Sequence, residues 1–166
     1  MSTPTRTTTI FLCDSKQPQY IYLLKRAPTK TFAPNLYTGV GGKIEGKEAP
    51  LENAYRELEE ETGLKNIALT EFGRLIVVSY WTVYQFFGLY NGPVPKCPEG
   101  TIEKFKISNI INLPLIPTQE IFCQEWKNRN WQTNKPFTIF IEREKMEDLY
   151  SKITKQEIKE GLLENS

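Results

Sequence analysis

The stretch GVGGKIEGKEAPLENAYRELEEETGL, Gly39–Leu64, decides the fold of this chain, because a glycine cluster leads directly into a short acidic segment. Pro50 fits the first turn of a helix, where its missing N–H is not needed. Gly63 can adopt the left-handed conformation that ends a helix. We therefore predict a helix from Pro50 to Thr62.

The predicted helix has an apolar face and an acidic face. At about 100° per residue, one arc carries the apolar side chains that we expect to face the core, namely Leu51, Ala54, Tyr55 and Leu58. The neighbouring arc carries three glutamates at i, i+3 and i, i+4 spacing, Glu57, Glu60 and Glu61. Glu52 and Glu59 point to solvent.

The acidic face has two interpretations. Like charges at i, i+4 cost an exposed helix only about 0.2–0.5 kcal/mol per pair, so a solvated surface is one of them. If protein and substrate line the face, with an effective dielectric near 20 and oxygens about 5 Å apart, each pair repels by roughly 3 kcal/mol. A hard divalent cation relieves that repulsion, and Mg²⁺ prefers one or two carboxylates together with water and phosphate oxygens.

The spacing of these residues resembles the motif of a known family. Counted from Gly42, Glu48 follows after five residues, Arg56-Glu57-Leu58 after seven more, and Glu60-Glu61 after one, before Thr62-Gly63-Leu64. This pattern is similar to the complete Nudix box of the Nudix hydrolases, spanning Gly42–Leu64. The resemblance implies an α/β protein with the Nudix fold, an α/β/α sandwich around a mixed β-sheet.

The resemblance also implies roles for the matching residues. The implied metal ligands, for Mg²⁺ with Mn²⁺ as a substitute, are Glu57, Glu60, Glu61 and the backbone carbonyl of Gly42 or of Gly41. Arg56 and Glu48 would form an ion pair that braces the loop against the helix. The implied reaction is the attack of water on a diphosphate that is linked to another group.

A further carboxylate is expected downstream of the box. Nudix enzymes often bring one from this part of the chain, as a metal ligand or as the base that activates water. Glu99, which is followed by Gly100, resembles that pattern, and Glu103 is the alternative; a surface position stays open for each. We expect Glu57 or Glu99 to take the proton from water.

A competing motif overlaps the same residues. Gly41, Gly46 and Lys47 match the start of a phosphate-binding P-loop. That loop requires Ser or Thr at the next position to meet Mg²⁺, whereas this chain has Glu48 there. We therefore reject the P-loop.

Composition excludes several other classes of site. The 166 residues contain no histidine, which rules out Ser-His and Cys-His nucleophile pairs and histidine-based zinc sites. Lys and Arg total 21 against 20 Asp and Glu, so no bulk positive charge favours a nucleic acid polymer or an anionic membrane. The widely spaced Cys13, Cys97 and Cys123 suggest neither a disulfide framework nor a zinc knuckle.

The organisation of the chain is that of a simple globular protein. We expect one domain over residues 1–166, with 1–7 loosely held, acting as a monomer or homodimer. The N-terminus lacks the apolar core of a signal peptide, and no apolar run approaches the length of a membrane span. We expect a cytoplasmic protein whose partner is a small nucleotide.

Alternation of apolar residues predicts the strands around the box. They are Thr8–Cys13, Tyr20–Lys25, Leu36–Val40, Ile67–Ser79 with a bulge at Gly73, Trp81–Tyr90, a short strand after Glu99, and Pro136–Glu142. Trp81–Tyr90 is apolar on both faces, which is typical of a central strand covered by helices.

Helical patterns follow the strands. We predict short helices at Ile107–Leu113 and Thr118–Asn128, and an amphipathic helix at Glu144–Leu163. The last of these offers four apolar side chains to the core: Met146, Leu149, Ile153 and Leu162.

Substrate contacts are expected where the second strand ends and around the glycine turn. Basic residues at the end of that strand often reach substrate phosphate in this family, which makes Arg26, or its neighbour Lys25, a candidate; solvated charges are the alternative. Thr38 and Lys43 flank the turn and are candidate substrate contacts too. Phe32 in the preceding loop could stack on a base or plug the core.

Several features resemble one branch of the family. The chain length, the end of the second strand at Leu23–Arg26 and the approach Tyr37–Lys43 are most similar to nucleoside triphosphate diphosphatases of the 8-oxo-dGTP type. Tyr80 lies where dinucleoside-polyphosphate hydrolases carry a tyrosine, and an ADP-ribose pyrophosphatase is a further alternative. A Nudix domain that senses a nucleotide without cleaving it is the non-enzymatic alternative.

Overall fold

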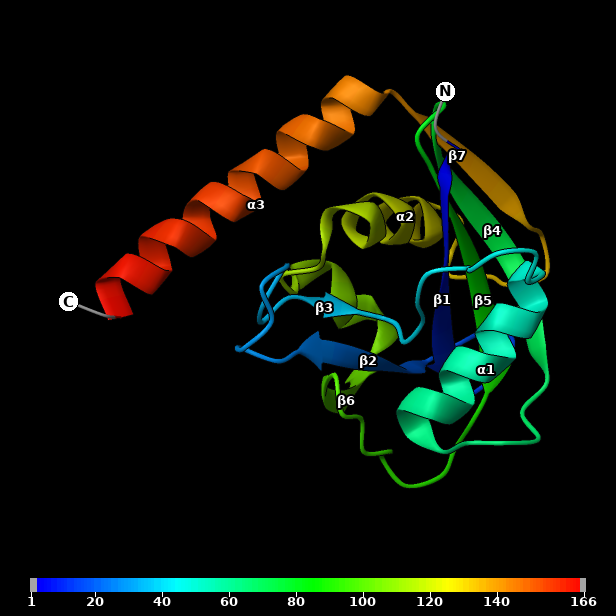
Figure 1. The fold of residues 1–166 in the computed structure, drawn as a ribbon. Helices are drawn as coiled ribbons and strands as arrows, with labels where there is room; N and C mark the ends of the chain where they lie inside the picture. The colour runs from blue at the N-terminus through cyan, green and yellow to red at the C-terminus, as the bar shows by residue number, and fades with distance from the viewer. Residues whose placement is uncertain (1–2, 165–166) are drawn as a thin grey trace.

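A seven-stranded mixed sheet forms the centre of the structure (Figure 1). This computed structural model describes the backbone of residues 3–164 and the side chains of residues 3–153. In chain order the strands are β1 (Thr5–Cys13), β2 (Tyr20–Arg26), β3 (Tyr37–Thr38), β4 (Leu69–Val77), β5 (Trp81–Leu89), β6 (Gly100–Lys106) and β7 (Phe137–Ile141). They run in the order β3-β2-β1-β5-β4-β7, and β6 pairs with β2. The β1–β5 and β4–β7 pairs are parallel, and the other pairs are antiparallel.

Helices cover both faces of this sheet. Alternate residues of β1 point to opposite sides, so Ile10 packs in the core under α1 (Pro50–Thr62), together with Ala54 and Leu58. Phe11 packs in the other core, under α2 (Pro117–Asn128), where it contacts Trp126. The 3₁₀ helix η1 (Ile107–Asn112) and α3 (Arg143–Glu164) also lie on the α2 side. The α/β/α sandwich with a mixed sheet is therefore confirmed.

Most of the predicted elements are present with small shifts of their ends. α1 has the predicted bounds, β5 is a central strand between β1 and β4, and the β4–β5 register shifts between Glu71 and Gly73. β1 begins at Thr5, three residues earlier than predicted, because residues 5–7 continue the parallel pairing with β5. Met146 of α3 is buried as expected, whereas Leu162 lies outside the residues whose side chains are described.

The sheet is divided between β1 and β2. The two strands pair only at Leu12 and Cys13, and beyond that point β2 pairs with β3 instead. The chain then leaves β3 and crosses to β1, where Val40 bridges Ile10 and Lys43 bridges Thr7. This crossing explains why β3 has only two residues, where a strand Leu36–Val40 was predicted. It also leaves an opening between the two halves of the sheet.

The buried face of α1 differs from the predicted one. Leu51 and Tyr55 were expected in the core, but 44% and 42% of these side chains are exposed. Asn53 is fully buried instead, because it has polar partners in the interior. Its amide nitrogen donates to the Lys43 carbonyl (2.9 Å) and to Glu48 Oε1 (2.8 Å), and its amide oxygen accepts from the Thr8 hydroxyl. Asn53 thus joins α1 to β1 and to the glycine turn.

Cys13, Cys97 and Cys123 are free. Within the described residues 3–164, none of the helices has the combination of length and apolar character that crossing a bilayer requires.

We predict that Asn53→Ala lowers the free energy of unfolding by about 2–3 kcal/mol, because it leaves buried polar partners without hydrogen bonds. Leu51→Ala, which truncates an apolar but exposed side chain of the same helix, should change it by less than about 0.5 kcal/mol. Urea denaturation followed by circular dichroism measures both values. Equal losses in the two variants would show that Asn53 does not anchor the helix.

Candidate active site

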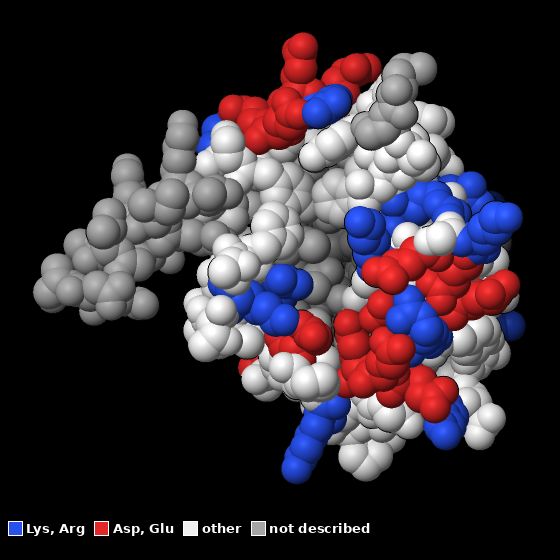
Figure 2. Space-filling view, viewed as in Figure 1, with Lys and Arg blue, Asp and Glu red and all other residues white. Residues whose placement is uncertain are grey.

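A cleft of about 200 Å³ occupies the opening between the two halves of the sheet. β1 lines it with Thr7, Thr8 and Thr9, β2 with Leu24 and Arg26, and the crossing segment with Thr38, Gly39, Gly41 and Gly42. In Figure 2, acidic side chains gather over α1 on one side of the hollow, and basic side chains lie across it near the β2–β3 loop. The cleft therefore places charges of both signs around one opening.

The acidic side of the cleft is built by packing α1 against the glycine turn. The N–H of Gly41 donates to Glu61 Oε2 at 3.2 Å. At Gly42 an added Cβ would lie 2.5 Å from Glu57 Oε1, so a side chain there would displace the Glu57 carboxylate. Gly41 has a φ of 150°, which non-glycine residues rarely adopt, and it passes close to the Thr8 carbonyl. Both glycines are therefore required for the two carboxylates to reach the turn.

An ion pair holds the loop before α1 against the helix. Arg56 donates from Nε to Glu48 Oε2 (2.7 Å) and from Nη2 to Glu48 Oε1 (3.1 Å). These bonds, with the one from Asn53, lower the pKa of Glu48 to about 2. The remaining guanidinium nitrogen, Nη1, lies 3.1 Å from Glu60 and 3.4 Å from Glu57. Arg56 therefore reaches three carboxylates at once.

The two inward glutamates lie in an unfavourable electrostatic environment. Burial raises the pKa of Glu61 to about 8; the Gly41 N–H opposes this shift, whereas the charges of Glu57 and Glu99 add to it. Burial also raises the pKa of Glu57, against the opposing effect of Arg56. A cation bound between these carboxylates would remove the repulsion.

The downstream glutamates have different surroundings. Glu99 lines the cleft together with Glu61, and its carboxylate contacts the Lys30 ammonium group. Glu103 accepts a hydrogen bond from the Tyr37 hydroxyl at 2.7 Å. Burial and this bond raise the pKa of Tyr37 to about 12. Only Glu99 of the two is therefore brought to the cleft.

The residues of the acidic side fit a hard divalent cation. The donors are carboxylates and glycine carbonyls, all oxygen atoms, and the space that a Cβ would fill at Gly42 is occupied by the Glu57 carboxylate. The Gly42 carbonyl accepts from the Thr8 N–H at 3.0 Å, which makes the Gly41 carbonyl the more available of the two. In the described part of the chain, no three acidic or cysteine side chains converge closely enough to hold an ion as they stand. Glu60 is 57% exposed and pairs with Arg56, so it lies furthest from such an arrangement.

The expected substrate contacts divide into two groups. Arg26 and Thr38 line the cleft, and Arg26 Nε donates to the Phe32 carbonyl at 3.0 Å. Lys43 has an exposed side chain and does not line the cleft, although its carbonyl accepts from Asn53. The basic side of the cleft therefore comes from the end of β2.

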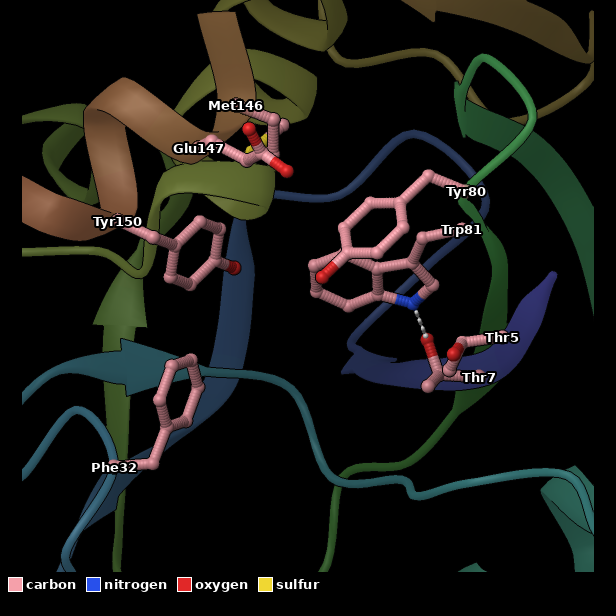
Figure 3. Close-up of a pocket in the computed structure, with 8 residues that line it drawn as sticks. All are labelled: Thr5, Thr7, Phe32, Tyr80, Trp81, Met146, Glu147 and Tyr150. Atoms are coloured by element: carbon pink, nitrogen blue, oxygen red, sulfur yellow. Dashed lines mark hydrogen bonds between the residues drawn. The ribbon is translucent and has the colours of Figure 1, made fainter. Parts of the chain in front are cut away.

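A second cavity, of about 320 Å³, adjoins the cleft and has aromatic walls (Figure 3). The two share Thr7, Phe32 and Trp81 in their linings. Tyr80 and Trp81 lie on one side of the cavity, and Phe32 and Tyr150 lie on the other (Figure 3). The sequence analysis identified Phe32 as a possible base contact. It missed the contribution of α3 to the cavity, because nothing in the local pattern links that helix to the glycine turn.

We predict that the protein without divalent metal becomes less stable as the pH rises from about 4.5 to about 8. The folded state keeps a proton on Glu61 throughout this window, whereas the unfolded state loses it. Glu61→Gln removes this dependence, so in EDTA at pH 9 it should be more stable than the parent by roughly 2–4 kcal/mol, since one pKa unit corresponds to about 1.4 kcal/mol. Thermal melting at pH 6 and pH 9 measures the effect.

The matched control for this measurement is Glu59→Gln, because Glu59 is an exposed residue of the same helix and pairs with Lys65. Its melting temperature should follow that of the parent at both pH values. Parallel pH curves for the parent and Glu61→Gln would show that the Glu61 carboxylate is not held protonated.

Comparison with known proteins agrees with this fold and site. A family model described as NUDIX domain matches residues 3–133. A MutT protein from Bacillus halodurans is 22% identical with a TM-score of 0.59, over 84% of this chain and 92% of that one. A MutT protein from Methanosarcina mazei is 19% identical with a TM-score of 0.60, over 78% of this chain and 98% of that one. The NUDIX domain of Shewanella oneidensis NrtR, in complex with ADP ribose, is 12% identical with a TM-score of 0.61, over 80% and 91%.

At these identities the solved structures establish a common fold, whereas the family model, which covers most of the chain, establishes membership. Nudix hydrolases generally use divalent metals, and the carboxylates and glycine backbone of this cleft are suited to one. The chain belongs to the NUDIX domain family and is a Nudix pyrophosphohydrolase.

Proposed function

We propose that this enzyme hydrolyses a nucleoside triphosphate to the monophosphate and pyrophosphate, with Mg²⁺ as the metal and Mn²⁺ as a substitute. The observation that carries the proposal is that the two cavities share part of their walls. Carboxylates and glycine backbone line one end, aromatic rings line the other, and Thr7, Phe32 and Trp81 belong to both linings. A nucleotide has the same two ends, a polyphosphate chain and a planar base.

The phosphate end would be held from both sides of the cleft. Glu57, Glu61 and the Gly41 carbonyl, with Glu60 after rotation away from Arg56, would hold the metal, which would neutralise phosphate charge and lower the pKa of the attacking water. Arg26 and Thr38 would contact phosphate oxygens from the β2–β3 side. Glu48 and Arg56 would hold α1 in its position relative to the glycine turn, without contacting substrate.

The reaction would consist of one displacement at phosphorus. A bond forms between the water oxygen and the phosphorus that stays with the nucleoside, and the bridging bond to the pyrophosphate breaks. The water proton passes to a carboxylate, for which Glu57 and Glu99 are the candidates. Glu99 lines the cleft together with Glu61, and its carboxylate contacts the Lys30 ammonium group.

ADP-ribose is the second candidate substrate. It is favoured by the likeness to the NUDIX domain of NrtR, which is complexed with ADP ribose. ADP-ribose carries a diphosphate between two sugars and an adenine ring, so it too would place phosphate at the carboxylates and a base against aromatic rings. Dinucleoside polyphosphates share these parts.

Within the first candidate class, the nucleoside triphosphates, we propose the oxidised nucleotide 8-oxo-dGTP as the preferred substrate.

We expect the purified protein to release pyrophosphate and a monophosphate from one nucleoside triphosphate in the presence of Mg²⁺. The panel is 8-oxo-dGTP, the common nucleoside triphosphates, ADP-ribose and diadenosine polyphosphates, with products separated by ion-exchange chromatography. AMP from ADP-ribose or from a diadenosine polyphosphate, with no triphosphate cleaved, would replace the proposal by the second candidate. A nucleotide that binds but survives intact with Mg²⁺ would indicate a sensor.

We predict that Glu61→Gln lowers kcat by about 10²–10³-fold, or roughly 3–4 kcal/mol, because it removes a charged oxygen from the proposed metal site. The fold should remain intact, since the Glu61 side chain lies outside the apolar core under α1. Glu59→Gln, on the solvent side of the same helix, should keep the kcat of the parent. A Glu61→Gln enzyme that retains the parent kcat would remove Glu61 from the metal site.

A further inference from the structure

Helix α3 supplies one wall of the aromatic cavity. Met146, Glu147 and Tyr150 line it from the first two turns of the helix (Figure 3). These residues lie beyond 3–133, the part of the chain that matches the family model. The cavity is therefore completed by residues outside the matched part of the chain.

Contacts on both sides hold this wall in place. Met146 is buried in the core on the α2 side, and the Arg143 guanidinium lies over the Tyr80 ring at 4.3 Å. The Tyr150 ring stacks on the Phe32 ring, with centroids 5.4 Å apart and an angle of 17° between the planes. It also meets the Trp81 ring at 5.9 Å. The wall is thus a fixed part of the cavity.

The chemistry of the lining suits a planar ring with hydrogen-bond donors on its edge. Trp81 Nε1 donates to the Thr7 hydroxyl at 2.8 Å, so the N–H of the indole ring already has a hydrogen-bond partner. Glu147 contributes a carboxylate to the lining, on the side of α3 that faces the cavity (Figure 3). Arg143 Nε donates to Glu147 Oε1 at 2.7 Å, which orients the carboxylate.

Among the bases, guanine presents two adjacent N–H donors, at N1 and at the exocyclic N2. A charged carboxylate has only acceptors, and its two oxygens can face both donors at once. Adenine has an acceptor at N1 beside its exocyclic amino group, so a carboxylate opposite that edge meets an unfavourable lone pair. A carboxylate therefore distinguishes the hydrogen-bonding edges of the two purines.

We propose that the aromatic cavity holds the base of the nucleotide and that Glu147 of α3 selects a guanine-type base. The inference rests on the proposed function, because the phosphates would lie at the carboxylates of the adjoining cleft. Tyr150 then positions the base by stacking, and the Glu147 carboxylate accepts hydrogen bonds from the N–H donors on the edge of the base.

The test is the binding of GMP and AMP to the full-length protein without metal, measured by isothermal titration calorimetry. Neither ligand has a phosphoanhydride bond, so binding is separated from hydrolysis. The parent should bind GMP more tightly than AMP. Glu147→Gln should weaken GMP binding by about ten- to a hundredfold and should not weaken AMP binding, because an amide pairs with the donor and acceptor of adenine.

Two further variants distinguish the recognition of the base by Glu147 from effects on folding. Glu144→Gln changes an exposed glutamate of the same helix turn that does not line the cavity, and it should bind both ligands like the parent. Tyr150→Leu should weaken both ligands by about tenfold, because it removes a stacking surface without changing the edge that is read. Melting temperatures check that each variant is folded.

The two proposals fail in different ways. If the parent cleaves no triphosphate but binds GMP in preference to AMP through Glu147, the proposed reaction is wrong and the base site stands. If Glu147→Gln binds GMP as the parent does, or if the parent prefers AMP, the assignment of Glu147 is overturned, even when hydrolysis is observed. With an active enzyme, Glu147→Gln should raise KM for the guanine triphosphate and leave kcat largely unchanged.

Discussion

The packing of the Glu57 and Glu61 carboxylates against the backbone of Gly41 and Gly42 is the constraint on which the rest of the structure depends. A Cβ at Gly42 would collide with Glu57, and the Gly41 N–H is the donor that meets Glu61. Burial raises the pKa values of both carboxyl groups, and the charge of Glu57 adds to the shift of Glu61. The turn and the helix are therefore held close together at an electrostatic cost that a bound cation would remove.

Polar contacts and apolar packing together set the position of α1. Ala54 and Leu58 provide its share of the core, but Asn53 is the residue that connects the helix to β1 and to the glycine turn. The Arg56–Glu48 pair adds a second connection on the side of the loop. Together they fix the rotation of the helix, which turns Glu57 and Glu61 inward and leaves Glu60 exposed.

The division of the sheet gives the molecule room for a ligand. Because β1 and β2 pair only at one end, the cleft reaches Thr7, Thr8 and Thr9 of β1. The cleft is charged where α1 and the end of β2 face each other, and aromatic where the β2–β3 loop, β5 and α3 meet. The charged end therefore comes from the part of the chain that matches the family model, and α3, outside that part, completes the aromatic end.

The sequence by itself determined the bounds of α1 and the central place of β5, because these follow from local periodicity. Its resemblance to the Nudix box also implied that Glu57 and Glu61 lie beside the glycine turn. Only the tertiary structure decided that Asn53 is buried while Leu51 and Tyr55 are exposed, since burial of an amide depends on partners from β1 and the turn. It also decided which of Glu99 and Glu103 reaches the cleft, and that Phe32, Trp81 and Tyr150 share one cavity. Those residues are far apart in the chain, and no local pattern records which distant segments the sheet brings together.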